Sequence, residues 1–176
     1  MIKDLKEILL SQEQIKQRVT ELGKEVTKVY KGKNPVLICI LKGAIVFYAD
    51  LCRVINIPIR MEFVSLSSYG NSAVSSNSII VHHELLTDPK DQDIIIVEDI
   101  VDTGLTMQTF KNQLLDANAK SVAICSLLNK PEMNKLHIDY IGFDIGNDFV
   151  VGYGLDYAEK YRNLPYICIL KKEIYT

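Results

Sequence analysis

The sequence lacks a long hydrophobic run. None of its apolar stretches approaches the roughly 20 residues that a helix needs to cross a bilayer, although 48% of the 176 residues are hydrophobic. The first ten residues, MIKDLKEILL, carry charges throughout, which a secretory signal peptide does not. We therefore expect a cytoplasmic protein without a membrane partner, whose apolar residues form the core of one domain over residues 1–176.

Paired cysteines and metal-binding spacings are also absent. The four cysteines stand singly within or beside apolar stretches, and none belongs to a C-x-x-C motif. This distribution is typical of reduced, mostly buried thiols in a cytosolic protein. The histidines, His82, His83 and His137, show no E-x-x-H spacing, so we interpret them as loop or surface residues and not as metal ligands.

The charge balance offers no basic surface. The chain has 20 basic and 22 acidic residues, with a formal net charge of -2, and no stretch is rich in lysine or arginine. This composition argues against a broad nucleic-acid-binding face. It does not argue against a local anion site.

Helix and strand patterns alternate along the chain. Ser11 followed by Gln14 predicts a capping box, and apolar residues at 4-3-4-3 spacing from Ile15 to Val29 predict a helix with one buried face. Continuous apolar runs such as Val36–Leu41 are typical of buried parallel strands. The other expected strands cover residues 59–66, 78–85, 94–98, 121–128, 140–143, 149–151 and 166–170, and further helices cover residues 44–55 and about 107–117. This alternation predicts a doubly wound α/β sheet.

The stretch IIIVEDIVDTGLT, from Ile94 to Thr106, places three acids at the end of a strongly apolar strand. It has no G-x-x-x-x-G-K-[ST] and no G-x-G-x-x-G sequence, and the three-residue step between Asp99 and Asp102 does not fit D-x-D-x-T. The P-loop, the dinucleotide fingerprint and the phosphatase motif are therefore excluded. In doubly wound sheets, ligands bind at the carboxyl ends of strands, where these acids lie.

The turn Asp102–Thr106 has the properties of a phosphate site. Its glycine permits close backbone approach, and its free N–H groups and the positive end of the following helix attract an anion. Glu98 and Asp99 would repel a phosphate, but they could accept hydrogen bonds from a diol or hold a hydrated divalent cation. A ribose 5-phosphate combines both groups. The alternative is that the acids only cap the helix and face solvent, which would explain Asp102 but not the other two.

Several stretches resemble phosphoribosyltransferases. VEDIVDTGLT is similar to the phosphoribosyl-diphosphate signature of that family, in which an apolar strand is followed by two acids, two apolar residues and Asp-Thr/Ser-Gly-x-Thr. LKGAIVFYADL, SSYG, LLNKP and FVVGYGLDYAEKYRNLPYI resemble segments of bacterial-type hypoxanthine-guanine phosphoribosyltransferases. The resemblance runs from about Gln14 to Leu170. It implies a mostly parallel five-stranded type I core with a small hood lobe, formed by N- and C-terminal segments.

The resemblance implies a Mg²⁺-dependent reaction in which hypoxanthine or guanine displaces pyrophosphate from phosphoribosyl diphosphate, giving IMP or GMP. Glu98 and Asp99 would hold the ribose hydroxyls, in part through Mg²⁺. The phosphate loop would consist of Asp102, Thr103, Gly104, Leu105 and Thr106. Asp102 would also exchange a proton with the purine N7 as the catalytic acid or base.

Further residues take their roles from the same resemblance. Lys130 would donate to the purine O6, which favours a 6-oxopurine over adenine because an ammonium group has no acceptor. Phe149 would stack on the base, and the Val150 backbone would contact its edge. Without the resemblance, Lys130 is typical of a solvated loop residue, and Phe149 of a core strand.

The remaining assignments concern pyrophosphate and closure. Asp156 would bind a second Mg²⁺, and Arg162, Lys42 and the Gly43 backbone would contact pyrophosphate. Ser68 and Tyr69 would belong to a loop that closes over the reaction centre and excludes water. The family is usually dimeric or tetrameric, so a homodimer or homotetramer is expected.

Two positions depart from the family pattern. Leu105 stands where many relatives have Lys or Asn, and Gly146-Asn147 stands where relatives often have Pro-Asp. The second departure leaves the preference between guanine and xanthine open. A nucleic-acid-binding regulator with the same fold is a further alternative, although the acidic composition and Asp102 favour an enzyme.

Overall fold

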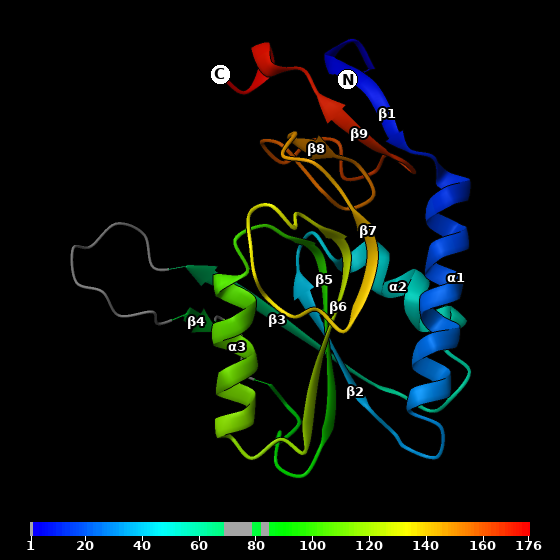
Figure 1. Cartoon of the computed structure of the whole chain (residues 1–176), viewed down its shortest axis with the longest axis vertical. Helices are drawn as coiled ribbons and strands as arrows, with labels where there is room; N and C mark the ends of the chain where they lie inside the picture. Colours follow the sequence, from blue (N-terminus) through cyan, green and yellow to red (C-terminus); the bar gives the residue numbers. More distant parts are fainter. Residues whose placement is uncertain (1, 69–78, 82–84) are drawn as a thin grey trace, which may run out of the picture.

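The computed structural model describes residues 2–68, 79–81 and 85–176, and it contains two sheets (Figure 1). The larger sheet has the strand order β4-β3-β2-β5-β6-β7, and the smaller one has the order β1-β9-β8. The strands are β1 (Leu5–Leu10), β2 (Val36–Leu41), β3 (Arg60–Ser68), β4 (Ile79–Val81), β5 (Asp93–Val101), β6 (Ser121–Asn129), β7 (Tyr140–Asp144), β8 (Val150–Val151) and β9 (Ile167–Leu170). The helices are α1 (Gln12–Val29), α2 (Ile45–Val54) and α3 (Leu105–Asp116), with short 3₁₀ turns η1 (Ile2–Asp4) and η2 (Lys172–Ile174).

The larger sheet confirms the predicted five-stranded parallel core. Strands β3, β2, β5, β6 and β7 run parallel, and β4 adds an antiparallel strand beside β3. The chain first moves from β2 to β3 on one side and then resumes at β5 on the other side of β2. The strand order therefore reverses between β2 and β5, and ligands bind at such a switch point in doubly wound folds.

Helices cover both faces of this sheet, with α1 and α2 on one side and α3 on the other (Figure 1). Alternate side chains of each central strand face the two helix layers, which explains why these strands are apolar at nearly every position. Leu37, Cys39, Ile95 and Val97 pack in the cluster that includes α1 and α2, whereas Ile38, Ile94 and Ile96 pack with α3.

The long helix α1 begins as predicted. The Ser11 side chain accepts a hydrogen bond from the Gln14 N–H, and the Gln14 side chain accepts one from the Ser11 N–H, which completes the capping box. The helix is fixed to the sheet by Arg18, which donates to the carbonyls of Ile141 and Gly142 in β7 at 2.7 and 3.1 Å. The prediction that Val29 faces the core was wrong, because its side chain lies at the last turn and is 55% exposed.

The smaller sheet brings the two ends of the chain together (Figure 1). Strand β1, which was not predicted, pairs antiparallel with β9. The strand has charged residues and no regular apolar alternation, and its pairing with β9 contains two register shifts. For this reason the sequence pattern did not indicate it. The Tyr161 hydroxyl donates to Asp4 Oδ2 at 3.0 Å, so the C-terminal segment also holds the turn before β1. The division into one domain with a hood lobe stays a prediction.

Other expectations differ in their bounds. Strand β5 continues to Val101, three residues beyond the predicted end at Glu98, so Asp99 also lies within the strand. Of the strand expected over residues 78–85, the structure describes Ile79–Val81 as β4, while His82 and His83 lie outside the described residues. His137 is exposed, as expected.

In the described part of the chain, no helix is both long and apolar enough to cross a bilayer.

The cysteines agree with the prediction of buried free thiols. All four are unpaired, and three of them, Cys39, Cys125 and Cys168, are buried. Burial raises the pKa of the Cys52 thiol, which is only partly covered, to about 11. A thiol with such a pKa is protonated at neutral pH, so it behaves as a small apolar group.

Replacing Ser11 with alanine tests the capping box. We expect the free energy of unfolding to fall by about 1 kcal/mol, because the first turn of α1 loses its side-chain acceptor. Urea unfolding followed by circular dichroism measures this change. Thr20→Ala is the control, since the exposed Thr20 hydroxyl bonds only to the Lys16 carbonyl of its own helix, and its loss should not destabilise the protein.

Candidate active site

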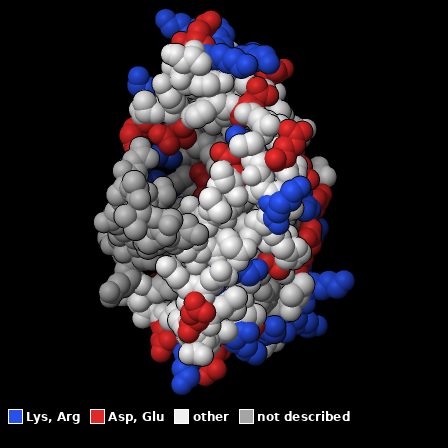
Figure 2. All heavy atoms as spheres, turned by 60° about the vertical axis from the view of Figure 1, so that its left-hand side comes forward, with Lys and Arg blue, Asp and Glu red and all other residues white. Residues whose placement is uncertain are grey.

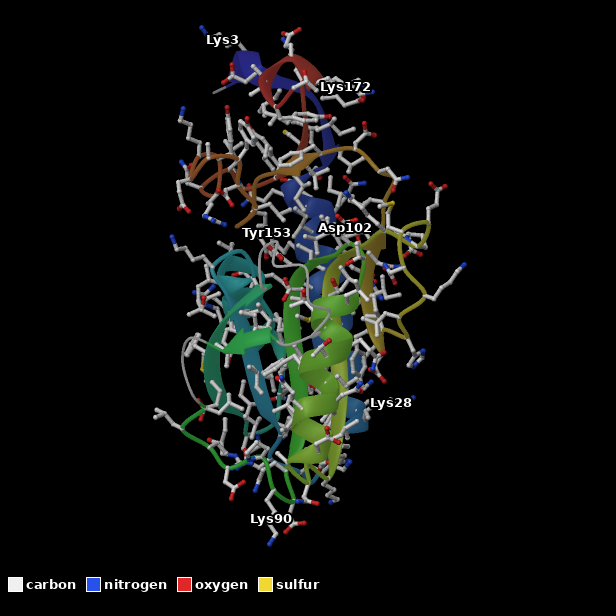
Figure 3. All side chains as sticks on the ribbon, turned by 90° about the vertical axis from the view of Figure 1, so that its left-hand side faces the viewer. Lys3, Lys28, Lys90, Asp102, Tyr153 and Lys172 are labelled. Carbon is white, nitrogen blue, oxygen red and sulfur yellow. The ribbon has the colours of Figure 1, made fainter. Side chains whose placement is uncertain are left out.

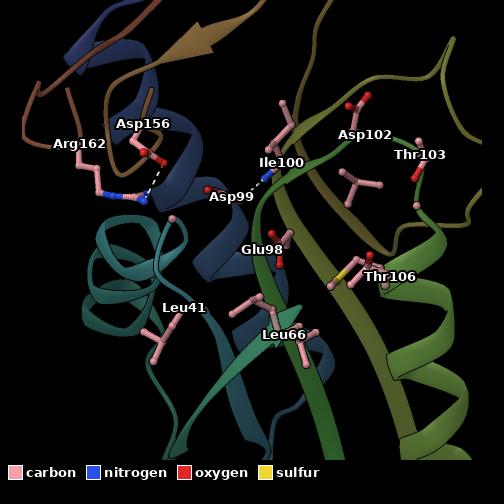
Figure 4. Close-up of a pocket in the computed structure, with 15 residues that line it drawn as sticks. Leu41, Leu66, Glu98, Asp99, Ile100, Asp102, Thr103, Thr106, Asp156 and Arg162 are labelled. Atoms are coloured by element: carbon pink, nitrogen blue, oxygen red, sulfur yellow. Dashed lines mark hydrogen bonds and ion pairs between the residues drawn. The ribbon is translucent and has the colours of Figure 1, made fainter. Parts of the chain in front are cut away.

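A pocket of about 350 Å³ opens where the carboxyl ends of β2 and β5 meet the segment before β9 (Figure 4). In the space-filling view, the surface is hollowed between the upper and lower parts of the molecule, with acidic side chains on the wall (Figure 2). Among the residues named from the sequence, those lining the pocket are Gly43, Glu98, Asp99, Asp102, Thr103, Gly104, Thr106, Asp156 and Arg162. The pocket thus coincides with the switch point of the sheet.

Glu98 and Asp99 form the floor of this pocket. Asp99 is buried and Glu98 is half-buried with its Oε2 atom shielded from water, and desolvation together with the neighbouring acid raises the pKa of Glu98 well above its ordinary value. Burial likewise raises the pKa of Asp99, although Asp99 Oδ1 accepts a hydrogen bond from the Ile100 N–H at 2.8 Å. Two adjacent buried carboxyl groups resist ionising together, so they favour a bound cation or a hydrogen-bond donor.

The residues present fit a divalent cation. Glu98 Oε2 is buried and has no hydrogen-bond partner among the described residues, which leaves an acidic oxygen available on the pocket floor. The described part of the chain contains no cluster of three or more potential metal ligands. Glu98 and Asp99 could therefore supply only part of a coordination shell, as is usual for Mg²⁺, which keeps several waters or substrate oxygens.

Gly43 approaches the two acids from β2. A Cβ atom at this position would overlap Asp99 Oδ2, so only glycine allows the backbone to lie against that carboxylate. Just before this glycine, the peptide bond between Leu41 and Lys42 is cis. Lys42 itself does not line the pocket: its side chain is 68% exposed, and its Nζ lies 3.4 Å from Glu159 Oε2.

The turn from Asp102 to Thr106 leads into α3. Gly104 is the N-cap residue with φ 76°, and no side chain caps the helix. The alternative in which Asp102 caps the helix is therefore wrong. Thr103, Gly104 and Thr106 line the pocket, and the first turn of α3 has no side-chain cap from the described chain. Leu105 does not line the pocket and is 67% exposed.

Asp156 and Arg162 form the opposite wall (Figure 4). Arg162 Nη2 lies 2.7 Å from Asp156 Oδ1, and Arg162 Nη1 donates to the Gly154 carbonyl at 2.7 Å. Asp156 Oδ2 accepts from the Glu159 N–H at 2.8 Å. The guanidinium is thereby held in place by the acid and the backbone, with a cationic edge directed at the pocket.

Lys130 follows β6 and approaches Asp102. Its Nζ lies 3.9 Å from Asp102 Oδ1, and its side chain is only 13% exposed, against 54% for Asp102. Asp102 sits at the end of the large sheet nearest the small one, opposite the end that carries Lys90 (Figure 3). The structure therefore brings together two residues that lie 28 positions apart, although Lys130 is beside the pocket and does not line it.

Phe149 and Val150 lie on the side of the small sheet. The Phe149 ring stacks on Tyr175 with centroids 5.0 Å apart, and its side chain is 36% exposed. Val150 opposes Ile169 at the edge of the sheet, and the Leu170 N–H donates to the Phe149 carbonyl at 2.9 Å. In an antiparallel ladder this pattern directs the N–H and C=O of Val150 away from β9, toward the open edge.

The two residues assigned to the closing loop are only partly described. Ser68 is the last residue of β3 and opposes Ile79 of β4. Tyr69 lies outside the described residues.

Sequence reasoning missed the residues behind the pocket. The Asn134 side chain donates to the Asn129 side chain and to the backbone carbonyls of Asp102 and Lys130. Gly154 was missed as well, although a Cβ there would overlap the Gly43 carbonyl. Isolated asparagines and glycines in loops and at strand ends follow no periodicity or motif spacing, so only tertiary contacts reveal them.

Comparison with known proteins agrees with this geometry. A family model described as phosphoribosyl transferase domain matches residues 6–158. Hypoxanthine-guanine phosphoribosyltransferases from Streptococcus thermophilus and Bacillus subtilis are 47% and 46% identical, covering 99% and 98% of this chain and 98% and 97% of their own lengths. The crystal structure of a hypoxanthine phosphoribosyltransferase from Staphylococcus aureus has a TM-score of 0.95 at 40% identity, covering 100% of this chain and 97% of that one.

The chain therefore belongs to the phosphoribosyltransferase family. Its place within that family is with the hypoxanthine-guanine phosphoribosyltransferases, as the sequence resemblance indicated.

Replacing Glu98 with glutamine tests the coupling of the two buried acids. Because the pKa of Glu98 is raised on folding, the metal-free protein loses stability as pH rises from the unfolded-state pKa through the folded-state pKa. Above that window, Glu98→Gln should raise the free energy of unfolding by at least about 1 kcal/mol. Denaturant unfolding at several pH values without divalent cations measures the difference.

Glu173→Gln, at an exposed position away from the pocket, provides the control and should change the free energy of unfolding by less than about 0.5 kcal/mol. If Glu98→Gln is no more stable than the parent protein at alkaline pH, the two acids do not repel one another as inferred.

Proposed function

We propose that this protein transfers the 5-phosphoribosyl group from phosphoribosyl diphosphate to N9 of hypoxanthine or guanine, giving IMP or GMP and pyrophosphate. One observation carries the proposal: three groups of residues lie together at the same edge of the sheet. They are the acids Glu98 and Asp99, the uncapped start of α3, and the pair formed by Asp102 and Lys130. Each group suits one part of a nucleoside monophosphate.

The phosphate of the substrate would bind at the start of α3. The N–H groups from Thr103 to Thr106 and the hydroxyls of both threonines can donate to its oxygens, while the helix dipole favours the negative charge. The ribose would then extend toward Glu98 and Asp99, whose carboxyl oxygens accept from the 2′ and 3′ hydroxyls.

Bound Mg²⁺ would neutralise charge on the diphosphate and orient the ribose hydroxyls. Glu98 and Asp99 would hold one ion, and Asp156 would hold a second near the pyrophosphate. Arg162, whose guanidinium lies against Asp156 on the wall across from the acids, would contact the pyrophosphate itself. Lys42 and the Gly43 N–H would complete the pyrophosphate contacts.

The purine would lie above Asp102. A carboxylate beside N7 can take or give a proton as N9 forms its bond to C1 of the ribose, so Asp102 acts as the catalytic acid or base. Lys130 would donate to O6, the free backbone groups of Val150 would contact the base edge, and Phe149 would stack on the ring. The rest of the rate enhancement comes from holding both substrates in line.

The reading as an enzyme has two rivals. A regulator that binds nucleic acid would need a basic surface, whereas the face in Figure 2 mixes acidic and basic side chains without a continuous basic area. A preference for adenine would conflict with a lysine at the O6 position. Xanthine remains open, because Gly146-Asn147 replaces the Pro-Asp pair of many relatives.

The proposal extends to the cell and the assembly. The protein would act in the cytoplasm as a homodimer or homotetramer, as is usual in its family, and Ser68 and Tyr69 would belong to a loop that covers the bound substrates.

A base panel tests the reaction. The protein is mixed with Mg²⁺ and phosphoribosyl diphosphate, and each of hypoxanthine, guanine, xanthine and adenine is added separately while ultraviolet absorbance reports nucleotide formation. Turnover of hypoxanthine and guanine, but not of adenine, is expected. A folded protein that binds the diphosphate yet uses no base, and is retained tightly on heparin at low salt, would contradict the proposal and favour the regulator.

Asp102→Asn removes the proton acceptor while keeping the shape of the side chain. Turnover should fall by about 10²–10⁴-fold, the range of general acid–base catalysis, whereas the affinity for phosphoribosyl diphosphate should change little. Steady-state kinetics and direct binding of the diphosphate give the two values. Equal losses in both would show that Asp102 serves binding and not proton transfer.

Lys130→Ala removes the donor to O6. The KM for hypoxanthine should rise at least about tenfold, because a charged hydrogen bond is lost and its partner is left without a donor. The KM for phosphoribosyl diphosphate should stay within about twofold of the parent value. An unchanged KM for the base would exclude Lys130 from the base pocket.

A further inference from the structure

Two neighbouring strands of the large sheet, β6 and β7, end in polar residues whose side chains form a chain of hydrogen bonds with an asparagine of the following loop. Asn129, the last residue of β6, donates through Nδ2 to Oδ1 of Asp144, the last residue of β7, at 2.6 Å. Asn134 Nδ2 then donates to Asn129 Oδ1 at 3.2 Å. We call Asp144, Asn129 and Asn134 the asparagine relay.

Asn134 carries the relay to the two residues proposed for base chemistry. Its Nδ2 lies 2.8 Å from the Asp102 carbonyl and 3.0 Å from the Lys130 carbonyl, and its Oδ1 accepts from the Leu136 N–H at 3.2 Å. One side-chain amide therefore contacts the backbone of both residues.

The pairing of β5 with β6 explains why such a link is needed. The ladder ends with Val101 opposite Asn129, and its last backbone hydrogen bond runs from the Lys130 N–H to the Val101 carbonyl at 3.0 Å. Beyond this point the chain diverges into the phosphate loop on one side and the lysine loop on the other. Asn134 replaces the missing ladder contact between them.

The direction of every donor in the relay is determined by Asp144. An ionised carboxylate only accepts hydrogen bonds, so Asn129 must turn its NH₂ group toward it and its oxygen toward Asn134. Asn134 must then present its NH₂ group, which is the group that the two carbonyls also require. Asn129 is 6% exposed, so water has little access to its side-chain amide, whereas the bond from Asn134 to the Asp102 carbonyl lies at the surface.

We propose that Asn134 and Asn129 are positioning residues that hold Asp102 and Lys130 in the mutual geometry that a bound purine requires. Neither asparagine lines the pocket, so both act through the backbone of other residues. The assignment rests on the proposed function, because it is the purine that must meet the Asp102 carboxylate and the Lys130 ammonium, 3.9 Å apart, at once.

Asn134→Asp is the sharpest single test. Aspartate keeps the oxygen that accepts from Leu136 but places a second acceptor against three acceptor oxygens. The kcat/KM for hypoxanthine should fall about tenfold to hundredfold, the loss expected when buried partners remain unmet. Asn112→Asp is the matched control, because Asn112 is an exposed residue of α3 that only accepts from Gln108 Nε2, and its kcat/KM should not change.

A rescue experiment separates positioning from a general loss of stability. Asn129→Asp should lower kcat/KM because its carboxylate faces Asp144, whereas Asp144→Asn alone should have little effect, since an asparagine can donate or accept. In the double variant Asn129→Asp/Asp144→Asn, the new carboxylate accepts from both neighbours. It should restore kcat/KM to within about threefold of the parent value.

Thermal unfolding is measured for every variant, and kinetics are compared only where the protein is folded at the assay temperature. Rescue of kcat/KM, together with an Asn134→Asp loss greater than that of Asn112→Asp, would support the relay. An active Asn134→Asp protein, or a double variant no better than Asn129→Asp, would overturn it. If the parent protein and Asn112→Asp use no purine, the proposed function fails and the relay proposal fails with it; turnover by both leaves the relay as the only assignment at risk.

Discussion

The burial of two adjacent acids at the carboxyl end of β5 is the constraint on which the site depends. Burial raises the pKa of both Glu98 and Asp99, so their joint ionisation is unfavourable without a counter-charge. A glycine must face them, since any Cβ at position 43 would overlap Asp99. Position 154 is also restricted to glycine, because a Cβ there would overlap the Gly43 carbonyl. The segment before β9 therefore packs closely against the end of the large sheet. The acids thereby determine where both walls of the pocket stand.

A second constraint is the uncapped start of α3. Gly104 occupies the N-cap position in a left-handed conformation, and no side chain satisfies the first N–H groups. A bound anion can accept hydrogen bonds from these N–H groups instead. Glu98 and Asp99 lie a few residues earlier, near the end of β5. The placing of positive backbone groups next to buried negative side chains suits a ligand that carries a phosphate and a diol. Asn134 holds this loop from behind through the Asp102 carbonyl.

Local signals predicted the elements with strong patterns. Examples are the capping box at Ser11 and Gln14, the continuous apolar strands and the acid-rich turn. Each depends on residues only a few positions apart, so it can be recognised directly in the sequence. Strand β1 was missed because its pairing with β9 joins the two ends of the chain, and its charged edge shows no clear alternation. Val29 was misplaced because the helix ends there and its side chain escapes the core.

The sequence by itself determined the doubly wound core, the turn Asp102–Thr106 before α3 and the two acids that precede it, because periodicity and short motifs are local properties of the chain. Only the tertiary structure decided which side chains from distant parts of the chain contact one another. It brought Lys130 to 3.9 Å from Asp102, set Arg162 against Asp156 and directed the Val150 backbone toward an open edge. It also joined Asn129, Asn134 and Asp144, which no motif connects. These contacts depend on strand order and register, which are set by packing over the whole domain.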